Sequence, residues 1–179
     1  MTEAAAVYGQ ALYDLARDEG LSQNILAELT ALDKSLCAEP GFLQLLSAPN
    51  IPKEERVHIL DVSFRGKTHP YVLNFLKILT EKGYIKHFSG CCRTYRQHYN
   101  RDNGIVTVTA YTAIALPAEQ RRKLTAKLST VTGKTIELDC RIDPEALGGV
   151  RLDFDGRQVD GTVRRRLEDI RGILKNTVL

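Results

Sequence analysis

The sequence predicts an α+β protein of two domains, an N-terminal all-α bundle of six helices followed by a small α/β module. Two observations lead to this prediction. As far as Asn100, apolar residues recur every three or four positions, which is the period of an amphipathic helix. Beyond Gly104 the period shortens to two, which is typical of strands. We therefore expect one domain over residues 1–103 and a second over residues 104–179.

Glycines and prolines divide the first 103 residues into helices. Gly20 and Gly83 follow apolar series and suit the left-handed position at a helix C-terminus, while Pro40 forbids continuation of the second helix. Ser22 can cap that second helix. Pro70 opens the fifth helix where its missing N–H is harmless. The expected helices span residues 4–17, 22–39, 42–46, 57–64, 71–82 and 85–100.

The fifth helix is more apolar than one core-facing stripe requires. Its apolar residues cover most of the circumference: Val72, Leu73, Phe75, Leu76, Ile78 and Leu79. The first helix shows a weaker excess, because Ala4, Val7 and Ala11 lie beside the apolar face formed by Tyr8, Leu12 and Leu15. The fifth helix should therefore be buried on two sides, or on one side by its own domain and on the other by a partner.

The second domain is predicted to run strand, helix, strand, hairpin, helix. Residues 105–113 are rich in β-branched side chains, and residues 136–142 alternate strictly between apolar and charged. Between them, a helix begins at Pro117 and ends at Gly133. The chain is therefore expected to form an all-α bundle followed by a small α/β module.

The hairpin and the last helix are predicted from their turn residues. Asp155-Gly156 lies between the expected strands Val150 to Phe154 and Arg157 to Asp160, and this dipeptide suits a two-residue type I′ turn because both positions need positive φ. Thr162 then precedes an amphipathic series and suits a helix N-cap. The apolar stripe of that helix contains Val163, Leu167, Ile170, Leu174 and Val178.

The charge argues against a dedicated nucleic-acid-binding protein. The net charge is +3, and all of it comes from the second half, which has 13 basic and 10 acidic residues against 12 and 12 in residues 1–103. A nucleic-acid-binding adaptor that uses the basic C-terminal module is the alternative function. Its basic residues would be Arg151, Arg157, Arg164, Arg165 and Arg166. Tyr111 and Phe154 are the module's only aromatic residues, fewer than stacking on bases usually needs.

No residue set suggests catalysis, a cofactor or a metal ion. The four histidines lack a nucleophile at a suitable spacing, and the four cysteines lack a C-x-x-C motif and should be reduced thiols. Cys92 and Cys140 fall in apolar series and should be core residues, whereas Cys91 points about 100 degrees away from Cys92, so a structural role for the pair is not expected. Gly148-Gly149 precedes a strand, whereas a phosphate loop precedes a helix.

Two stretches resemble the delta subunit of F-type ATP synthases, the family of the mitochondrial oligomycin sensitivity-conferring protein, in its bacterial type. The more specific match is in the C-terminal part: Gly148-Gly149, Asp160-Gly161-Thr162-Val163, Arg164, Arg166 and Leu167. The N-terminal part adds Tyr8, Ala11, Leu12, Asp14, Leu15 and Ala16, then residues 74–79, Glu81 and Gly83. Thr162 departs from the usual serine, and Tyr84 stands where the family has an arginine.

The resemblance implies a non-catalytic stator subunit of a proton-translocating F-type ATP synthase. Such a subunit joins the alpha subunits of the catalytic head to the b subunits of the peripheral stalk, so that rotation is coupled to ATP synthesis. An N-terminal helix of an alpha subunit would enter a groove between the first and fifth helices. The expected contacts in this groove are Val7, Tyr8, Ala11, Leu15, Phe75, Ile78 and Leu79.

The same resemblance places the peripheral stalk on the second domain. The expected stalk contacts are Arg164, Leu167, Ile170, Leu174 and Val178. Leu167 and Ile170 could instead pack on the module's own sheet. With no apolar run near the ~18 residues of a membrane span and no signal peptide, we expect a peripheral protein at the cytoplasmic face of the cell membrane, held there through its partners.

Overall fold

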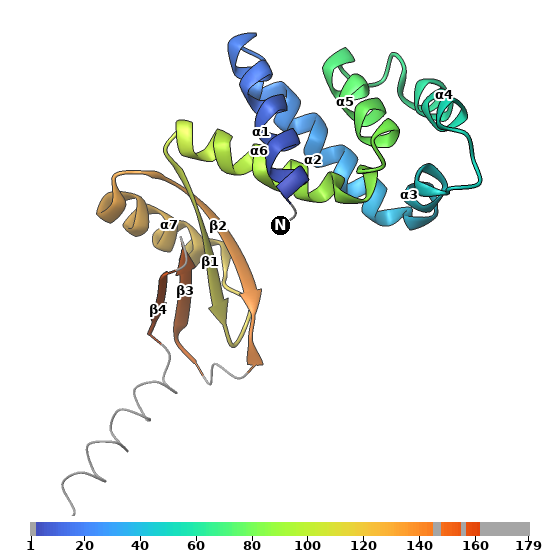
Figure 1. The fold of residues 1–179 in the computed structure, drawn as a ribbon. Helices are drawn as coiled ribbons and strands as arrows, with labels where there is room; N and C mark the ends of the chain where they lie inside the picture. Colours follow the sequence, from blue (N-terminus) through green and yellow to red (C-terminus); the bar gives the residue numbers. More distant parts are fainter. Residues whose placement is uncertain (1–2, 145–147, 155–156, 162–179) are drawn as a thin grey trace, which may run out of the picture. The chain divides into compact units, whose positions relative to one another are not determined.

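The computed structural model describes residues 3–144, 148–154 and 157–161, and it is an α+β structure, as the sequence predicts. The chain divides into two compact units, residues 1–100 (unit 1) and residues 101–179 (unit 2). A helical region comes first, and a module containing a strand, a helix and a strand follows it (Figure 1).

Helices make up all the regular structure described in unit 1, from residue 3 onward. The short 3₁₀ helix η1 covers Ile85–His87, immediately before the last helix. The α-helices are α1 (Glu3–Asp18), α2 (Ser22–Ala38), α3 (Pro40–Ser47), α4 (Lys53–Phe64), α5 (Pro70–Glu81) and α6 (Phe88–Asp102). The last of them, α6, continues two residues beyond the boundary between the units.

The first and last helices of unit 1 approach each other closely at Gly9. A Cβ atom at this position would lie 2.6 Å from the Cys91 carbonyl oxygen and 2.8 Å from the Cβ of Thr94. One turn away, a Cβ on Gly90 would meet the Cβ of Ala5 at 3.0 Å. Glycine is required at position 9 because any side chain would push α1 away from α6.

Cys91 and Cys92 both lie in the core, so the expectation that the pair has no structural role was wrong. Cys91 is buried beside Gly9 of α1, and the Cys92 thiol donates a hydrogen bond of 3.9 Å to the Leu29 carbonyl of α2. Because α6 is covered on two sides, two residues 100 degrees apart can both be buried.

The N-cap predicted at Ser22 was also wrong. Leu21 is the N-cap of α2 and makes no side-chain cap, while Ser22 is the first helical residue. The Ser22 carbonyl accepts a hydrogen bond of 2.9 Å from the hydroxyl of Tyr95, a fully buried side chain of α6. This bond satisfies the one polar atom of a large core residue.

Unit 2 contains a four-stranded sheet in the order β2-β1-β3-β4. β1 and its neighbour β2 are parallel and are connected through α7, while β1 with β3 and β3 with β4 are antiparallel. Its elements are β1 (Ile105–Thr112), α7 (Ala118–Thr132), β2 (Thr135–Ile142), β3 (Val150–Phe154) and β4 (Arg157–Asp160). The antiparallel pairing of β3 with β4, in which Phe154 lies opposite Arg157, confirms the predicted hairpin. The turn at 155–156 and the final helix predicted from Thr162 lie outside the described residues.

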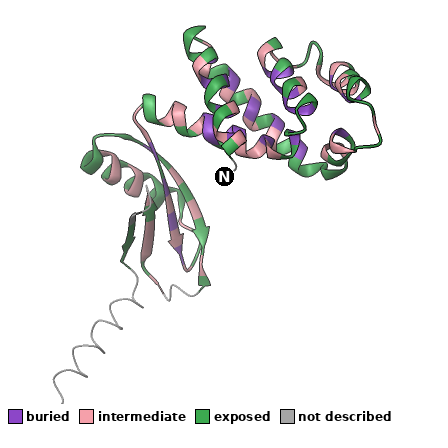
Figure 2. Ribbon diagram, viewed as in Figure 1, coloured by how far each residue is buried: buried purple, intermediate pink, exposed green. Residues whose placement is uncertain are grey.

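The core of unit 2 is small over the described residues. Val106, Val108 and Ile136 form its buried centre, and Leu128 of α7 packs against them. Cys140, which was expected in the core, is only half-buried because its strand β2 is at the edge of the sheet. Figure 2 shows buried positions on all the helices of unit 1 but on little of unit 2 beyond β1.

Candidate functional site

Four large apolar side chains of unit 1 are exposed on α1, on α5 and just after α5. Val7 and Leu15 of α1 are 61% and 43% exposed, Ile78 of α5 is 43% exposed, and Tyr84 is 39% exposed. We call these four residues, with Tyr8 and Ala11, the α1/α5 surface. Exposed apolar residues on neighbouring elements of one unit are typical of a protein-binding site.

The sequence of α1 gives the helix two apolar sides. Its core side consists of its buried residues, namely Ala5, Gly9, Leu12, Tyr13 and Ala16. Val7, Ala11 and Leu15 follow one another at intervals of four residues, and none of them is buried. They therefore form one exposed ridge along α1. Three of the predicted contacts are therefore on the surface, and the fourth, Tyr8, is half-buried.

Two of the predicted contacts on α5 belong to the core instead. Phe75 is 6% exposed and Leu79 is 0% exposed, and both are part of the core of unit 1. Of the predicted α5 contacts, only Ile78 is exposed. The sequence shows that α5 is apolar on most sides, but not which side faces α2 and α6, and this is why buried and exposed residues could not be separated.

Tyr84 is a member of this surface that the sequence pattern did not single out. Gly83 has a φ of +76°, and the Tyr84 N–H donates to the Leu79 carbonyl at 2.7 Å. This is the hydrogen-bond pattern that closes a helix with a left-handed glycine. The ring of Tyr84 lies 5.8 Å from the ring of Tyr8, at an interplanar angle of 47°. The contact connects the end of α5 directly to α1.

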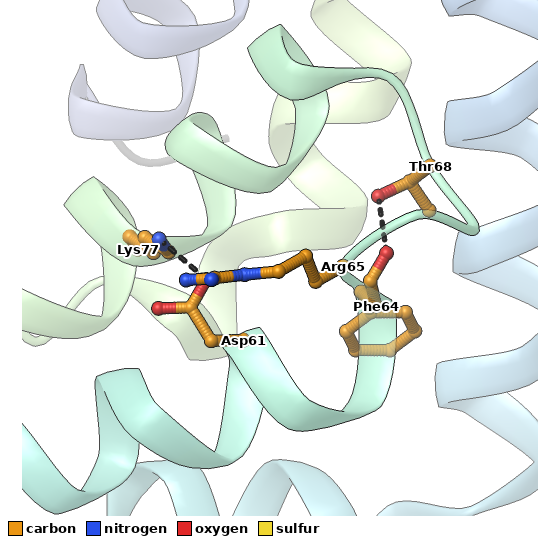
Figure 3. Close-up of polar contacts among 5 residues, drawn as sticks. All are labelled: Asp61, Phe64, Arg65, Thr68 and Lys77. Atoms are coloured by element: carbon orange, nitrogen blue, oxygen red, sulfur yellow. Dashed lines mark hydrogen bonds and ion pairs between the residues drawn. The ribbon is translucent and has the colours of Figure 1, made fainter.

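A polar cluster fixes α5 against α4 (Figure 3). Lys77 of α5 places its Nζ 2.7 Å from Oδ1 of Asp61 on α4, and Arg65 places Nη2 3.1 Å from the same oxygen. The ammonium of Lys77 is the main reason that the pKa of Asp61 lies below its usual value, and Arg65 adds to the effect. Lys77 directly precedes Ile78, so the cluster helps to set how α5 presents its exposed residue.

Contacts within unit 1 explain two of the four histidines. His69 caps α5 by accepting a hydrogen bond of 3.3 Å from the Tyr71 N–H, and its own backbone N–H donates to Glu28 at 2.8 Å. His98 stacks on Tyr13 with ring centres 5.7 Å apart. These are structural roles.

The two buried thiols of α6, Cys91 and Cys92, are unsuited to nucleophilic catalysis. Burial raises the pKa of the Cys91 thiol to about 11, and burial, with a contribution from Asp33, raises the pKa of Cys92 further. Both thiols are therefore protonated at neutral pH and are poor nucleophiles. Among the described residues, no group of three His, Cys, Asp or Glu side chains could hold a metal ion.

The residues predicted to contact the stalk, Arg164, Leu167, Ile170, Leu174 and Val178, lie outside the described residues. In the described part of unit 2, four large apolar side chains are exposed: Ile114, Val131, Ile142 and Val159. Val159 belongs to the edge strand β4 and Ile142 ends the edge strand β2. Within the described ranges, no helix is both long enough and apolar enough to cross a membrane.

Comparison with known proteins identifies the family. The model of the family described as ATP synthase delta (OSCP) subunit matches residues 4–174. The chain belongs to this family. Delta (OSCP) subunits are components of the stator and peripheral stalk of F-type ATP synthases, so the chain is a structural subunit of a membrane-bound complex and has no catalytic activity of its own. None of these findings supports the nucleic-acid-binding alternative.

Similar proteins match the chain over nearly its whole length. The ATP synthase subunit delta of Lactobacillus delbrueckii subsp. bulgaricus is 34% identical over 175 residues, covering 96% of each chain. That of Alkaliphilus oremlandii is 31% identical over 160 residues, covering 89% of each chain. A chain in the cryo-EM structure of the Toxoplasma gondii mitochondrial ATP synthase hexamer shares the fold of this delta-family chain, with a TM-score of 0.74 at 16% identity, covering 97% of this chain and 98% of that one.

Proposed function

We propose that the chain holds the catalytic head of its ATP synthase to the peripheral stalk, with residues 1–103 binding the head and residues 104–179 binding the stalk. In this proposal the α1/α5 surface receives an amphipathic helix from the N-terminal end of an alpha subunit. The b subunits of the stalk bind through the C-terminal residues, at the cytoplasmic face of the cell membrane. A rotary motor transmits torque only if its head is held still, so this joint needs tight binding and no chemistry.

One observation supports the head contact most strongly. The two helices that the family resemblance assigns to the groove are helices of unit 1 that expose large apolar residues, Val7 and Leu15 on α1 and Ile78 on α5. An amphipathic partner helix binds such a surface by inserting apolar residues spaced at i, i+3, i+4 and i+7. Burying a side chain of this size contributes roughly 1.5–3 kcal/mol.

The head contact can be tested with Ile78→Asp. A labelled synthetic peptide of the alpha-subunit N-terminus would be titrated with the full-length chain, and its fluorescence anisotropy recorded. We expect the variant to bind at least about tenfold more weakly, because a carboxylate would have to lose its water inside an apolar contact. The matched control is Val62→Asp, since Val62 is equally apolar and is exposed on α4.

Equal binding by wild type and Ile78→Asp would exclude α5 from the head contact. Phe75→Asp is not an informative variant, because Phe75 is buried and a charge there would disrupt the core. Circular dichroism at 222 nm should show the same helix content for Ile78→Asp and wild type.

The stalk contact can be tested by ending the chain after Thr162. This truncation removes the residues predicted to bind the stalk: Arg164, Leu167, Ile170, Leu174 and Val178. We expect pull-down of the b subunits to be lost while binding of the alpha-subunit peptide is retained. The reverse result, with peptide binding lost and b-subunit binding kept, would invert the assignment of the two domains.

A further inference from the structure

We infer that Tyr84 is an aromatic anchor of the α1/α5 surface, and that Lys82 and Lys86 beside it select a partner helix with an acidic residue next to the apolar residue that contacts Tyr84. This inference rests on the head contact proposed above. It adds one contact residue and a charge requirement on the partner.

The backbone around Tyr84 is fixed at both sides. Gly83 closes α5 in the left-handed region, and two hydrogen bonds of this closing motif run from Gly83 N–H to the Thr80 carbonyl at 3.1 Å and from Tyr84 N–H to the Leu79 carbonyl at 2.7 Å. The Tyr84 carbonyl then accepts from the His87 N–H at 2.8 Å, at the start of η1. Tyr84 thus directly follows the glycine that closes α5.

The ring of Tyr84 contacts two other rings and is still exposed. Its ring centre lies 5.8 Å from that of Tyr8 and 6.3 Å from that of His87. At 39% exposure, it leaves a large part of an aromatic ring in contact with solvent. An aromatic side chain that is already ordered before binding loses little conformational entropy on binding, which is why such residues often dominate interfaces.

Basic residues surround Tyr84 in the chain. Lys82 and Lys86, two residues before and two residues after it, are both exposed. The exposed Glu81 carboxylate and the negative end of the α5 dipole offset part of this positive charge. A partner helix with a carboxylate at this end would gain from both ammonium groups, whereas a basic residue there would be repelled.

The test compares four full-length proteins by titration of the labelled alpha-subunit peptide: wild type, Tyr84→Ala, Tyr84→Phe and Lys82→Gln/Lys86→Gln. We expect Tyr84→Ala to weaken binding about tenfold. Tyr84→Phe keeps the ring and should bind like wild type. The double lysine variant should bind up to about fivefold more weakly, and most clearly at low salt.

Each outcome separates this inference from the head contact itself. If wild type fails to bind the peptide, the head contact and this inference are both overturned. If wild type and Tyr84→Ala bind equally, only the anchor role of Tyr84 is overturned. If the double lysine variant binds like wild type at low salt, the charge requirement is overturned. Should Tyr84→Ala lose helical circular dichroism, Tyr84→Leu, which keeps an apolar side chain without the ring, replaces it, and equal binding by Tyr84→Leu and wild type has the same meaning.

Discussion

Unit 1 buries twenty apolar residues in a single core, whereas the core of the described part of unit 2 consists of three, Val106, Val108 and Ile136. Every α-helix of unit 1 contributes buried residues, but α7 contributes none. Since buried apolar area is the main favourable term in folding, burial among the described residues stabilises unit 1 more than unit 2. The apolar residues exposed on unit 1 are therefore a small excess over a complete core, which is what a binding surface on a stable support requires.

The largest expected effect separates core from surface at two adjacent residues. Leu79→Ala should destabilise the protein by about 2–5 kcal/mol, because Leu79 is completely buried and its removal leaves a cavity. Its neighbour Ile78 is the matched control, and Ile78→Ala should cost far less because the side chain is already 43% exposed. Urea unfolding followed at 222 nm measures both. Equal losses would show that α5 is rotated relative to the structure described above.

The next effect tests the close approach of α1 and α6. Gly9→Ala should cost about 1–3 kcal/mol, because the new methyl group would lie within 3 Å of Cys91 and Thr94. Gly41→Ala in α3 is the control, since its methyl group would meet nothing within 4 Å. There the higher helix propensity of alanine should raise stability by up to about 1 kcal/mol. Opposite signs at the two glycines are the expected result, and a stabilising Gly9→Ala would contradict the close packing.

A smaller effect depends on pH and involves Asp61. Because the Lys77 and Arg65 cations lower the pKa of Asp61 in the folded protein, its ion pairs stabilise the fold at neutral pH. This contribution is complete above the unfolded pKa of about 3.9 and disappears as the pH falls through the lower folded value. Asp61→Asn should therefore be less stable than wild type at pH 7, and the difference should shrink below about pH 4.

Urea titrations at pH 7 and at acidic pH measure that difference. Glu55→Gln, which removes an exposed carboxyl on the same helix, is the control. A difference between wild type and Asp61→Asn that persists unchanged at low pH would mean that the ion pairs are not its cause.

The smallest effect concerns the apolar residues exposed on unit 2. Val159→Ser should change the free energy of unfolding by no more than about 0.5 kcal/mol, because Val159 is exposed on β4. A loss of more than that, measured in the same urea titrations, would show that this strand face is covered in solution. The contrast between the two units would then be smaller than the described residues suggest.

The sequence predicted an α+β chain with a helical region followed by a module that contains a strand, a helix and a strand, because glycine, proline and apolar period are local signals. Pro70 and Gly83 bracket α5, and the change of period after Gly104 marks the start of β1. The strand order was not predictable, since β1 pairs with β3 about 40 residues away and nothing local selects that partner. The Gly9 contact was missed for the same reason.

The candidate site was predicted only in part, for a related reason. The exposed ridge of Val7, Ala11 and Leu15 follows from helical spacing, whereas Phe75 and Leu79 could not be told from Ile78 without knowing where α2 and α6 lie. Tyr84 had a usable local signal, because an aromatic residue directly after a helix-closing glycine has a fixed backbone. The residues predicted to bind the stalk stay a prediction.

The contact between Gly9 and Cys91 also determines when unit 1 can fold during synthesis. Its two sides come from helices separated by most of the unit, since α1 ends at Asp18 and α6 begins at Phe88. The core between them contains Tyr95, so it cannot close until about 100 residues have left the ribosome. Until then α1 has no α6 to cover its buried side, and its apolar residues on both sides are available to chaperones.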